Sequence, residues 1–255
     1  MSDLPRSFTR EIVDDSTDLQ AAWESNAADW IAAARAPGHD SYWLYHREQF
    51  LELLPAPGRL TLDVGCGEGR LSRDLKALGH SVIGVDASPT MVEAARAADP
   101  SIEVHLADAA DLPFPDGHAD LIVAFMSLQD VSNPESALRQ AARVLEPGGR
   151  LCLAVVHPLG SAGRFDGYEP DSPFVIKGSY LARFRYRDSV ERGGLKMVFE
   201  SEHRPIHWYF AALEAAGFLV ERLRETDVPE KAVTESRQRR WQRLPLFLHV
   251  RAVRP

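Results

Sequence analysis

LDVGCGEGRL, residues 62–71, joins the end of an apolar strand to the start of a helix. Asp63 ends the strand, and Gly65, Gly67 and Gly69 follow it before the helix begins. A loop of glycines lets a ligand approach the backbone closely, and it faces the positive end of the helix dipole. Dinucleotide-binding proteins carry a similar loop, so this segment alone does not decide which cofactor binds.

The sequence around this loop predicts an α/β fold with a Rossmann-like sheet. Apolar stretches of strand length recur from Arg59 to the C-terminus, and helical patterns lie between most of them. Continuous apolar strands that alternate with helices are typical of a mostly parallel sheet covered by helices on both faces. The expected strands are residues 59–65, 81–86, 102–107, 121–125, 150–156, 218–225 and 245–253.

Two segments fall outside this alternation. Residues 1–57 are rich in aromatic residues with helical spacing, and we expect an N-terminal helical cap there. We expect residues 58–255 to form the α/β domain, with an insertion after the fifth strand at residues 158–204. The insertion is rich in glycine, proline and aromatic residues and is too long for a plain loop. We therefore expect a hairpin-containing insertion that covers the substrate.

Composition narrows the class of partner. The net charge is −8, which argues against a nucleic-acid ligand because such proteins usually carry a basic face. No apolar stretch is long enough for a membrane span, and the start lacks the pattern of a secretory signal, so we expect a cytoplasmic protein. His203 and His207 are separated by Pro205 and are not expected to share a helical face, so no metal site is predicted. A homodimer is compatible with the sequence.

Two further acidic residues narrow the class of ligand that we expect. Asp86 ends the second strand, where a carboxylate can accept hydrogen bonds from both hydroxyls of a ribose. Asp108 follows the third strand and adds a second acid, placed for an adenine amino group. Ligands of open α/β sheets bind outside the carboxyl ends of the strands, and Asp63, Asp86 and Asp108 are all expected there.

At this point the chain resembles the class I S-adenosylmethionine-dependent methyltransferases, in the group that modifies small molecules. The resemblance is carried by residues 62–96, 106–131 and 137–158, in this order and at the family's spacing. It implies a seven-stranded sheet whose last strand is antiparallel, and our count of strands agrees. It also implies S-adenosylmethionine as cofactor and a small molecule as methyl acceptor.

The resemblance further implies a role for each matching position. Asp63 and the glycine loop would hold the methionine part, Asp86 the ribose hydroxyls and Asp108 the adenine amino group. Small and apolar residues would pack on adenine or line the path to the sulfonium. The complete implied cofactor site is Asp63, Gly65, Cys66, Gly67, Asp86, Ala87, Met91, Asp108, Ala109, Phe125 and Met126.

The main alternative is a nicotinamide-dependent oxidoreductase on a similar fold. Its fingerprint requires a third glycine three positions after the second, and Arg70 stands there instead. Asp108 also has no role in that scheme. A non-catalytic protein that binds the cofactor is the other alternative, and a binding assay with activity measurements separates it from an enzyme.

The acceptor site leaves a fainter signal, because methyl transfer mainly requires alignment of donor and acceptor. His157 directly follows the fifth strand and is the candidate base, although a strand-ending role is also open. Gln129 follows the fourth strand, and His207 and Tyr209 begin a late helix; these three are candidate substrate contacts.

The roles of several other residues are left open by the sequence. Asp130 either orients the acceptor or simply precedes the helix that starts after Asn133. Trp30, Tyr42 and Arg47 of the N-terminal segment are candidates for covering the cofactor. The identity of the acceptor and of its accepting atom is left open.

Overall fold

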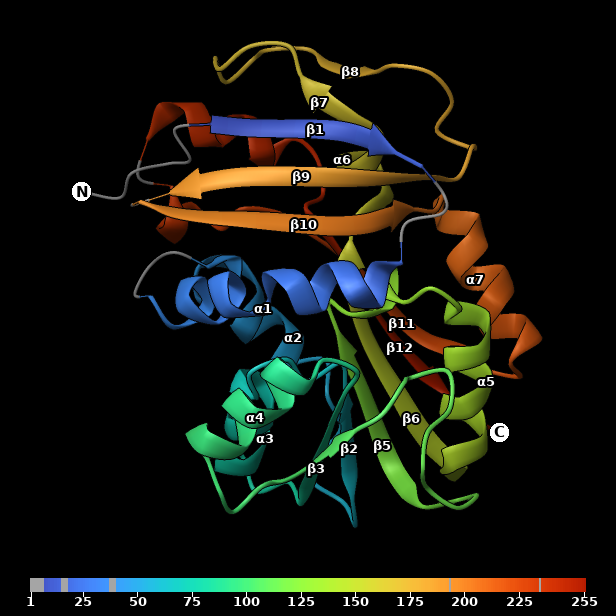
Figure 1. Cartoon of the computed structure of the whole chain (residues 1–255). Coiled ribbons are helices and arrows are strands. Elements are labelled where there is room, and N and C mark those ends of the chain that lie inside the picture. Colours follow the sequence, from blue (N-terminus) through green and yellow to red (C-terminus); the bar gives the residue numbers. More distant parts are fainter. Residues whose placement is uncertain (1–6, 15–17, 37–39, 193, 234) are drawn as a thin grey trace.

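A computed structural model describes residues 7–14, 18–36, 40–192, 194–233 and 235–255. It has a large lower layer built on one sheet and a smaller upper layer built on another, with helix α1 between them (Figure 1). Parts of the two predicted segments, residues 1–6, 15–17, 37–39 and 193, lie outside the described residues.

The predicted seven-stranded sheet is confirmed. Its spatial order is β11-β12-β6-β5-β2-β3-β4. Neighbours from β6 to β4 run parallel, whereas β12 is antiparallel to both β6 and β11, as expected for the last strand. The strands are β2 (Thr61–Val64), β3 (Val82–Asp86), β4 (Glu103–Leu106), β5 (Ala119–Phe125), β6 (Leu145–Val156), β11 (Leu219–Thr226) and β12 (Phe247–Val253).

Helices cover both faces of this sheet. One face packs on α5 (Pro134–Val144) and α7 (Ile206–Ala215), and the other on α2 (Arg47–Leu51) and α3 (Arg70–Ala77). Helix α4 (Pro89–Ala98) packs beside β3 and β4.

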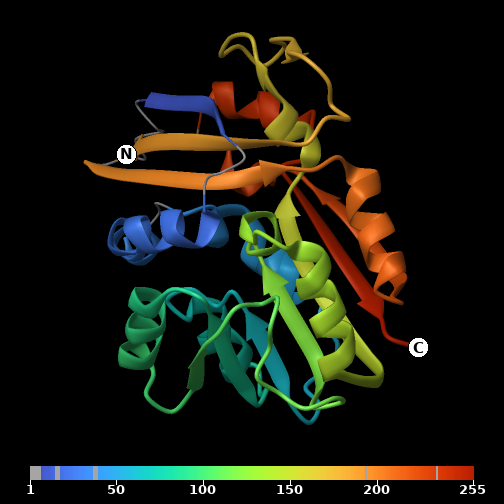
Figure 2. The same ribbon diagram turned by 45° about the vertical axis from the view of Figure 1, so that its right-hand side comes forward.

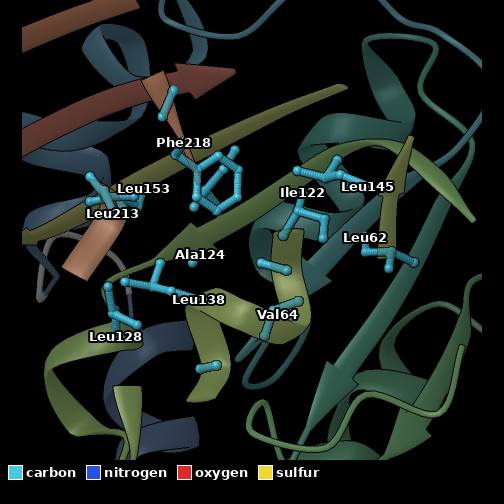
Figure 3. Close-up of a cluster of buried hydrophobic side chains, with 14 of the residues drawn as sticks. Leu62, Val64, Ile122, Ala124, Leu128, Leu138, Leu145, Leu153, Leu213 and Phe218 are labelled. Atoms are coloured by element: carbon cyan, nitrogen blue, oxygen red, sulfur yellow. The ribbon is translucent and has the colours of Figure 1, made fainter. Parts of the chain in front are cut away.

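Strand β5 shows how the sheet contributes side chains to a hydrophobic core on each of its two faces. Ile122 and Ala124 face the α5 side, where Figure 3 shows them among Leu62, Leu138 and Phe218. The alternate residues of β5, including Val123, belong to the core on the α3 side. Side chains on a strand alternate between its faces, so an uninterrupted apolar strand supplies both cores. Each fully buried aliphatic side chain contributes about 1.5–3 kcal/mol to folding.

The N-terminal segment corrects one expectation. Residues 1–57 were expected to be helical, but Ser7–Val13 forms strand β1. It pairs antiparallel with β9 (Phe184–Arg192), which pairs with β10 (Leu195–His203), so the insertion contains the expected hairpin. The alternating pattern of β1 is short, and its partner is distant in sequence, so no local signal marked it as a strand.

The remaining elements are one long helix and several short helical turns and strands. The N-terminal helix α1 (Leu19–Arg35) is followed by a π-helical stretch, η1 (Tyr42–His46). The remaining elements are short, namely η2 (Leu128–Asp130), α6 (Pro158–Ala162), β7 (Gly163–Phe165), β8 (Phe174–Ile176), η3 (Glu230–Ala232) and η4 (Ser236–Gln242).

The upper three-stranded sheet lies over α1, and α1 lies over the carboxyl ends of the large sheet; the turned view shows the same stacking (Figure 2). Helix α1 packs closely on β10 and on α4. The N-terminal segment and the insertion are thus neighbours in space, and both lie above the edge of the sheet where ligands of α/β proteins bind.

Arg10 of β1 links the upper sheet to α6. Its guanidinium donates to both carboxylate oxygens of Asp188, at 2.7 and 2.6 Å, and to the carbonyl oxygens of Gly160 and Ser161, each at 2.8 Å. Removing one partner of a largely buried ion pair costs about 3 kcal/mol. Arg10→Ala should therefore speed hydrogen exchange of β9 and β10 amides about 100-fold, while β5 and β6 amides stay protected.

Thr9→Ala is the matched control, because Thr9 is exposed on the same strand. Exchange measured by mass spectrometry should leave this variant like the wild type. Equal protection of β9 and β10 in Arg10→Ala and wild type would contradict the role given to β1.

Candidate cofactor and acceptor site

The glycine loop closely approaches the end of β5, the strand that pairs with β2. Gly65, Gly67 and Gly69 all have positive φ, which favours glycine. At Gly65 the approach is also steric, because a Cβ atom there would lie 2.3 Å from the Cβ of Ser127. The Ser127 hydroxyl donates to the carbonyl oxygen of Val64 at 2.8 Å, which holds the two strand ends together.

Asp86 organises the same loop from the neighbouring strand. Its carboxylate accepts the backbone N–H of Gly67 at 2.8 Å and that of Ser88 at 2.9 Å, one on each oxygen. Burial raises the pKa of Asp86, although these backbone N–H groups counteract the shift. Each carboxylate oxygen has a second lone pair that these bonds do not use.

Asp63 and Asp108 occupy different environments. Asp63 is buried beneath the loop and accepts the Ser72 hydroxyl at 2.6 Å, and burial raises its pKa to about 7. Asp108 is exposed and accepts the backbone N–H of Ala110 at 2.8 Å. The three acids thus stand at the ends of three adjacent strands, as predicted.

All eleven residues of the implied cofactor site line a single cavity of about 560 Å³. They form its floor, which the glycine loop and the ends of β2, β3 and β5 provide. Arg70, which the sequence argument used only to exclude a dinucleotide fingerprint, also lines the cavity. Its guanidinium pairs with Asp40 and lies over the rings of Trp30 and Tyr42.

Helix α1 forms the roof over this floor. Glu24 accepts the hydroxyl of Thr90 at 2.6 Å and that of Ser88, which ties α1 to the start of α4. Gln20 donates to the carbonyl oxygen of Ala87 at 3.2 Å. The indole N–H of Trp23, on the same helix, donates to the backbone of β10 at 3.2 Å.

The upper sheet closes the rest of the cavity, and sequence reasoning missed its individual residues. Tyr186, Asp188 and Val190 come from β9, and Phe199 and Ser201 from β10. The alternate spacing along each strand directs these side chains to the same face. The one sequence signal that indicated this wall was the aromatic content of residues 158–204.

Aromatic rings concentrate where α1 meets β10. Trp30 and Phe199 have ring centroids 5.7 Å apart in an edge-on arrangement, and Trp23 lies 6.0 Å from Trp30. Edge-on contacts of this kind are favourable and fix the rings relative to one another. Trp30 was a predicted cofactor cover, and it does line the cavity.

Gln129 and Asp130 bring polar groups to the apolar side of the cavity. Gln129 is 4% exposed and donates to the carbonyl oxygen of Met126 at 2.7 Å and to Asp130 at 3.2 Å. Asp130 also accepts the hydroxyl of Ser201 at 2.5 Å. Of the substrate contacts predicted from sequence, only Gln129 lines the cavity.

The structure places His157 outside the cavity lining and gives it a capping role. Its Nδ1 accepts the backbone N–H of Leu159 at 3.2 Å, at the start of α6. Its Nε2 then carries the proton and lies 2.9 Å from Glu225. Both ring nitrogens are therefore engaged, and burial lowers the pKa of the imidazole. The expectation that His157 faces the acceptor is not supported, because a strand end locates the backbone but not the direction of the side chain.

The other predicted contacts from the late helix also lie elsewhere. His207 is exposed on α7, and Tyr209 is buried in the core between α7 and the sheet. Neither lines the cavity. Tyr42 and Arg47 do not line it either, since both bind Asp74, the tyrosine hydroxyl at 2.5 Å and the guanidinium at 2.7 Å.

Two further features do not occur among the described residues. Within the described ranges, no helix is long and apolar enough to cross a membrane. No group of three or more histidine, cysteine or acidic side chains that could hold a metal ion occurs among those residues. Both cysteines, Cys66 and Cys152, are buried and unpaired thiols.

The fold and the residues on the floor of the cavity are those of a Rossmann-like nucleoside-binding domain. Comparison with known proteins supports this class. A family model described as "Methyltransferase domain" matches residues 62–153. A solved S-adenosylmethionine-dependent methyltransferase from Mesorhizobium loti is 26% identical, with a TM-score of 0.69, over 84% of this chain and 98% of the other. Residues 62–153 thus match a methyltransferase domain, and the fold is similar to that of an S-adenosylmethionine-dependent methyltransferase.

Two curated sequence relatives each match about half of the chain. A demethylmenaquinone methyltransferase from Clavibacter sepedonicus is 34% identical over 51% of this chain and 53% of its own length. The O-methyltransferase cnsE from Penicillium expansum is 38% identical over 51% of this chain and 48% of its own. The chain thus spans about half the length of these curated relatives.

The loop geometry generates a stability prediction. Gly65→Ala combines a positive φ with a clash against Ser127, and should lower the free energy of unfolding by about 3 kcal/mol. At Gly67 the nearest atom to an added Cβ is the Trp30 indole nitrogen, 3.9 Å away. Gly67→Ala should therefore cost only the backbone strain, about 1–2 kcal/mol. Urea unfolding measures both, and equal losses would contradict the close approach at Gly65.

Proposed function

We propose that this chain transfers a methyl group from S-adenosylmethionine to a small-molecule acceptor. The observation that supports this most strongly is that all eleven residues implied by the family resemblance line one cavity. The same cavity continues to an aromatic wall on the upper sheet, so donor and acceptor have room in a single enclosed space.

The residues of the floor fit the nucleoside part of the cofactor. We assign the ribose hydroxyls to Asp86, whose carboxylate keeps a lone pair on each oxygen beyond those used by Gly67 and Ser88. Met91, which is 3% exposed, and Ala87 supply an apolar surface for the adenine ring. Asp108 and Ala109 lie at the adenine end, where the amino group needs an acceptor.

The other end of the floor fits the methionine part. Arg70 supplies a cation for the carboxylate, and Asp63 lies beneath the glycine loop on the same side. Acidic side chains outnumber basic ones in the lining, which favours a ligand that carries an ammonium and a sulfonium. When bound, the cofactor supplies a methyl group on a positively charged sulfur.

The chain itself supplies alignment and exclusion of water. Helix α1 and the upper sheet form one cover, which we assign to residues 1–57 together with the insertion 158–204. Trp23, Trp30 and Phe199 of this cover enclose the space above the floor. Holding donor and acceptor in line can lower the barrier by about 7–11 kcal/mol, so a strong base is not required for turnover.

A nicotinamide-dependent reaction is less compatible with this site. The side chain of Arg70 fills space over Trp30 and Tyr42, whereas the dinucleotide fingerprint needs a glycine at this position. A cytoplasmic location and a homodimeric assembly remain predictions from the sequence.

The ribose assignment is tested by calorimetric titration with S-adenosylhomocysteine. Asp86→Ala should bind it roughly 30- to 1,000-fold more weakly, because two charge-assisted hydrogen bonds are lost. Asp108→Ala should lose less, since it removes one bond to a neutral amino group. Unfolding curves must show that each variant is folded, because Asp86 also holds the backbone of Gly67.

Asp111→Ala is the control for Asp108→Ala, because Asp111 is an exposed acid of the same loop that does not line the cavity. It should bind S-adenosylhomocysteine like the wild type. Unchanged affinity in a folded Asp86→Ala would refute the ribose assignment. Tight binding of NAD in place of S-adenosylhomocysteine would refute the proposed function.

A further inference from the structure

We propose that Asp130 takes the proton from the methyl acceptor, and that the acceptor is a small aromatic molecule with a ring hydroxyl. This inference rests on the proposed function and extends it to the acceptor side of the same cavity.

Asp130 lines the same cavity as the glycine loop. It is the last residue of η2, which begins shortly after the end of β5. Ser201 holds one carboxylate oxygen and Gln129 the other. Both contacts use the side chains of cavity-lining residues, so the carboxylate is held in place within the cavity lining.

The backbone of η2 is also held firmly. Arg204 is 1% exposed and donates to the carbonyl oxygens of Gln129 and Val131, each at 3.3 Å. Its charge is balanced by Glu202, whose carboxylate accepts from Arg204 at 2.6 Å. Asp130 is thus positioned by a network that reaches from β10 to the end of β5.

The charge state of Asp130 suits proton transfer near neutral pH. Burial raises the pKa of Asp130 to about 8, against the opposing effects of Ser201, Arg204 and Gln129. The ionisable groups that interact with it are Arg204, Tyr186 and Tyr209, and burial raises the pKa of both tyrosines, so they stay neutral there. A base works best when its pKa lies near the operating pH.

A second, independent feature points to a ligand that donates a hydrogen bond here. The Oε1 atom of Gln129 is buried and has no hydrogen-bond partner among the described residues. A buried acceptor without a partner is costly, and native proteins rarely leave one unpaired. The reacting hydroxyl donates its one proton to Asp130, so a second donor group on the ligand would supply the hydrogen bond that Gln129 lacks.

The surrounding wall fits a planar ring. Trp23, Trp30 and Phe199 present fixed aromatic surfaces, and Phe247 of β12 adds another ring to the lining. An aromatic ligand gains edge-on or offset contacts with such rings beyond the burial of its surface.

A hydroxyl fits this site better than an amine. A carboxylate beside an amine favours the protonated ammonium form, which has no lone pair for attack. A ring hydroxyl has an ordinary pKa of about 10, as in tyrosine, which is close enough to that of Asp130 for the proton to be shared. Removing this proton makes the oxygen a stronger nucleophile.

The step balances without any further reactant. The acceptor oxygen forms a bond to the methyl carbon, and the bond from that carbon to sulfur breaks with its electron pair moving to sulfur. The O–H bond breaks, its electrons stay on oxygen, and the proton moves to the Asp130 carboxylate. Asp130 later loses this proton to water.

The test uses 4-nitrophenol as the probe, because its phenolate form is coloured and methylation removes the colour. In the complex with S-adenosylhomocysteine, wild-type protein should bind the probe, and its phenolate colour should develop over two steps in pH. Two interacting acids titrate as a coupled pair. In Asp130→Asn the bound probe should titrate in a single step, because the partner acid is gone.

Turnover of the same probe with S-adenosylmethionine supplies the kinetic arm. Asp130→Asn should lose about 10²–10⁴-fold in kcat, with the affinity for S-adenosylhomocysteine unchanged. In the wild type, kcat should rise with pH as Asp130 ionises and then level off. Ser201→Ala removes a hydrogen bond that lowers the pKa of Asp130, so this rise should move about one pH unit higher.

Asp116→Asn is the control, because Asp116 is an exposed acid far from the lining residues, and it should match wild type in all readouts. Identical single-step titrations in wild type and Asp130→Asn would overturn the inference. So would the absence of probe binding or turnover in wild-type protein that binds S-adenosylhomocysteine. Failure to bind S-adenosylhomocysteine would instead count against the proposed function.

Discussion

The carboxylate of Asp86 connects the parts on which the cofactor site depends. It accepts the backbone N–H of Gly67 from the glycine loop and that of Ser88 from the start of α4. Ser88 in turn donates its hydroxyl to Glu24 of α1, so the contact extends from the floor of the cavity to its roof. The two backbone N–H groups favour the charged form of this carboxylate against the opposing effect of burial, and they fix its orientation. The loop, the adjoining helix and the covering helix are therefore held by one short chain of hydrogen bonds.

The cover is assembled from parts that are far apart in the sequence. Trp23 of α1 donates to the backbone of Glu200, 177 positions away, and β1 pairs with β9 of the insertion. The cover consequently encloses the glycine-loop end and the Asp130 end of the cavity together. This arrangement gives one enclosed space for two ligands, which is what an in-line transfer between them requires.

The floor of the cavity was predictable from sequence, whereas the wall formed by the upper sheet was not. Gly65 and Asp86 end predicted strands and Asp108 directly follows one, and parallel strands bring their carboxyl ends to one edge. The wall depends on tertiary contacts that leave no local pattern, such as the bond between Asp130 and Ser201. His157 illustrates the same limit, since its position at a strand end was right but its side chain turned to cap α6. Arg70 was noticed as an exception to a motif, and only the fold showed that it faces the cavity.

The most direct test of this account is a crystal structure of the chain with S-adenosylhomocysteine. The account predicts density for the ligand between the glycine loop and α1, with the ribose hydroxyls on Asp86 and the sulfur on the side of the cavity that leads to Asp130. A ligand bound elsewhere, or one whose ribose lies away from Asp86, would contradict it.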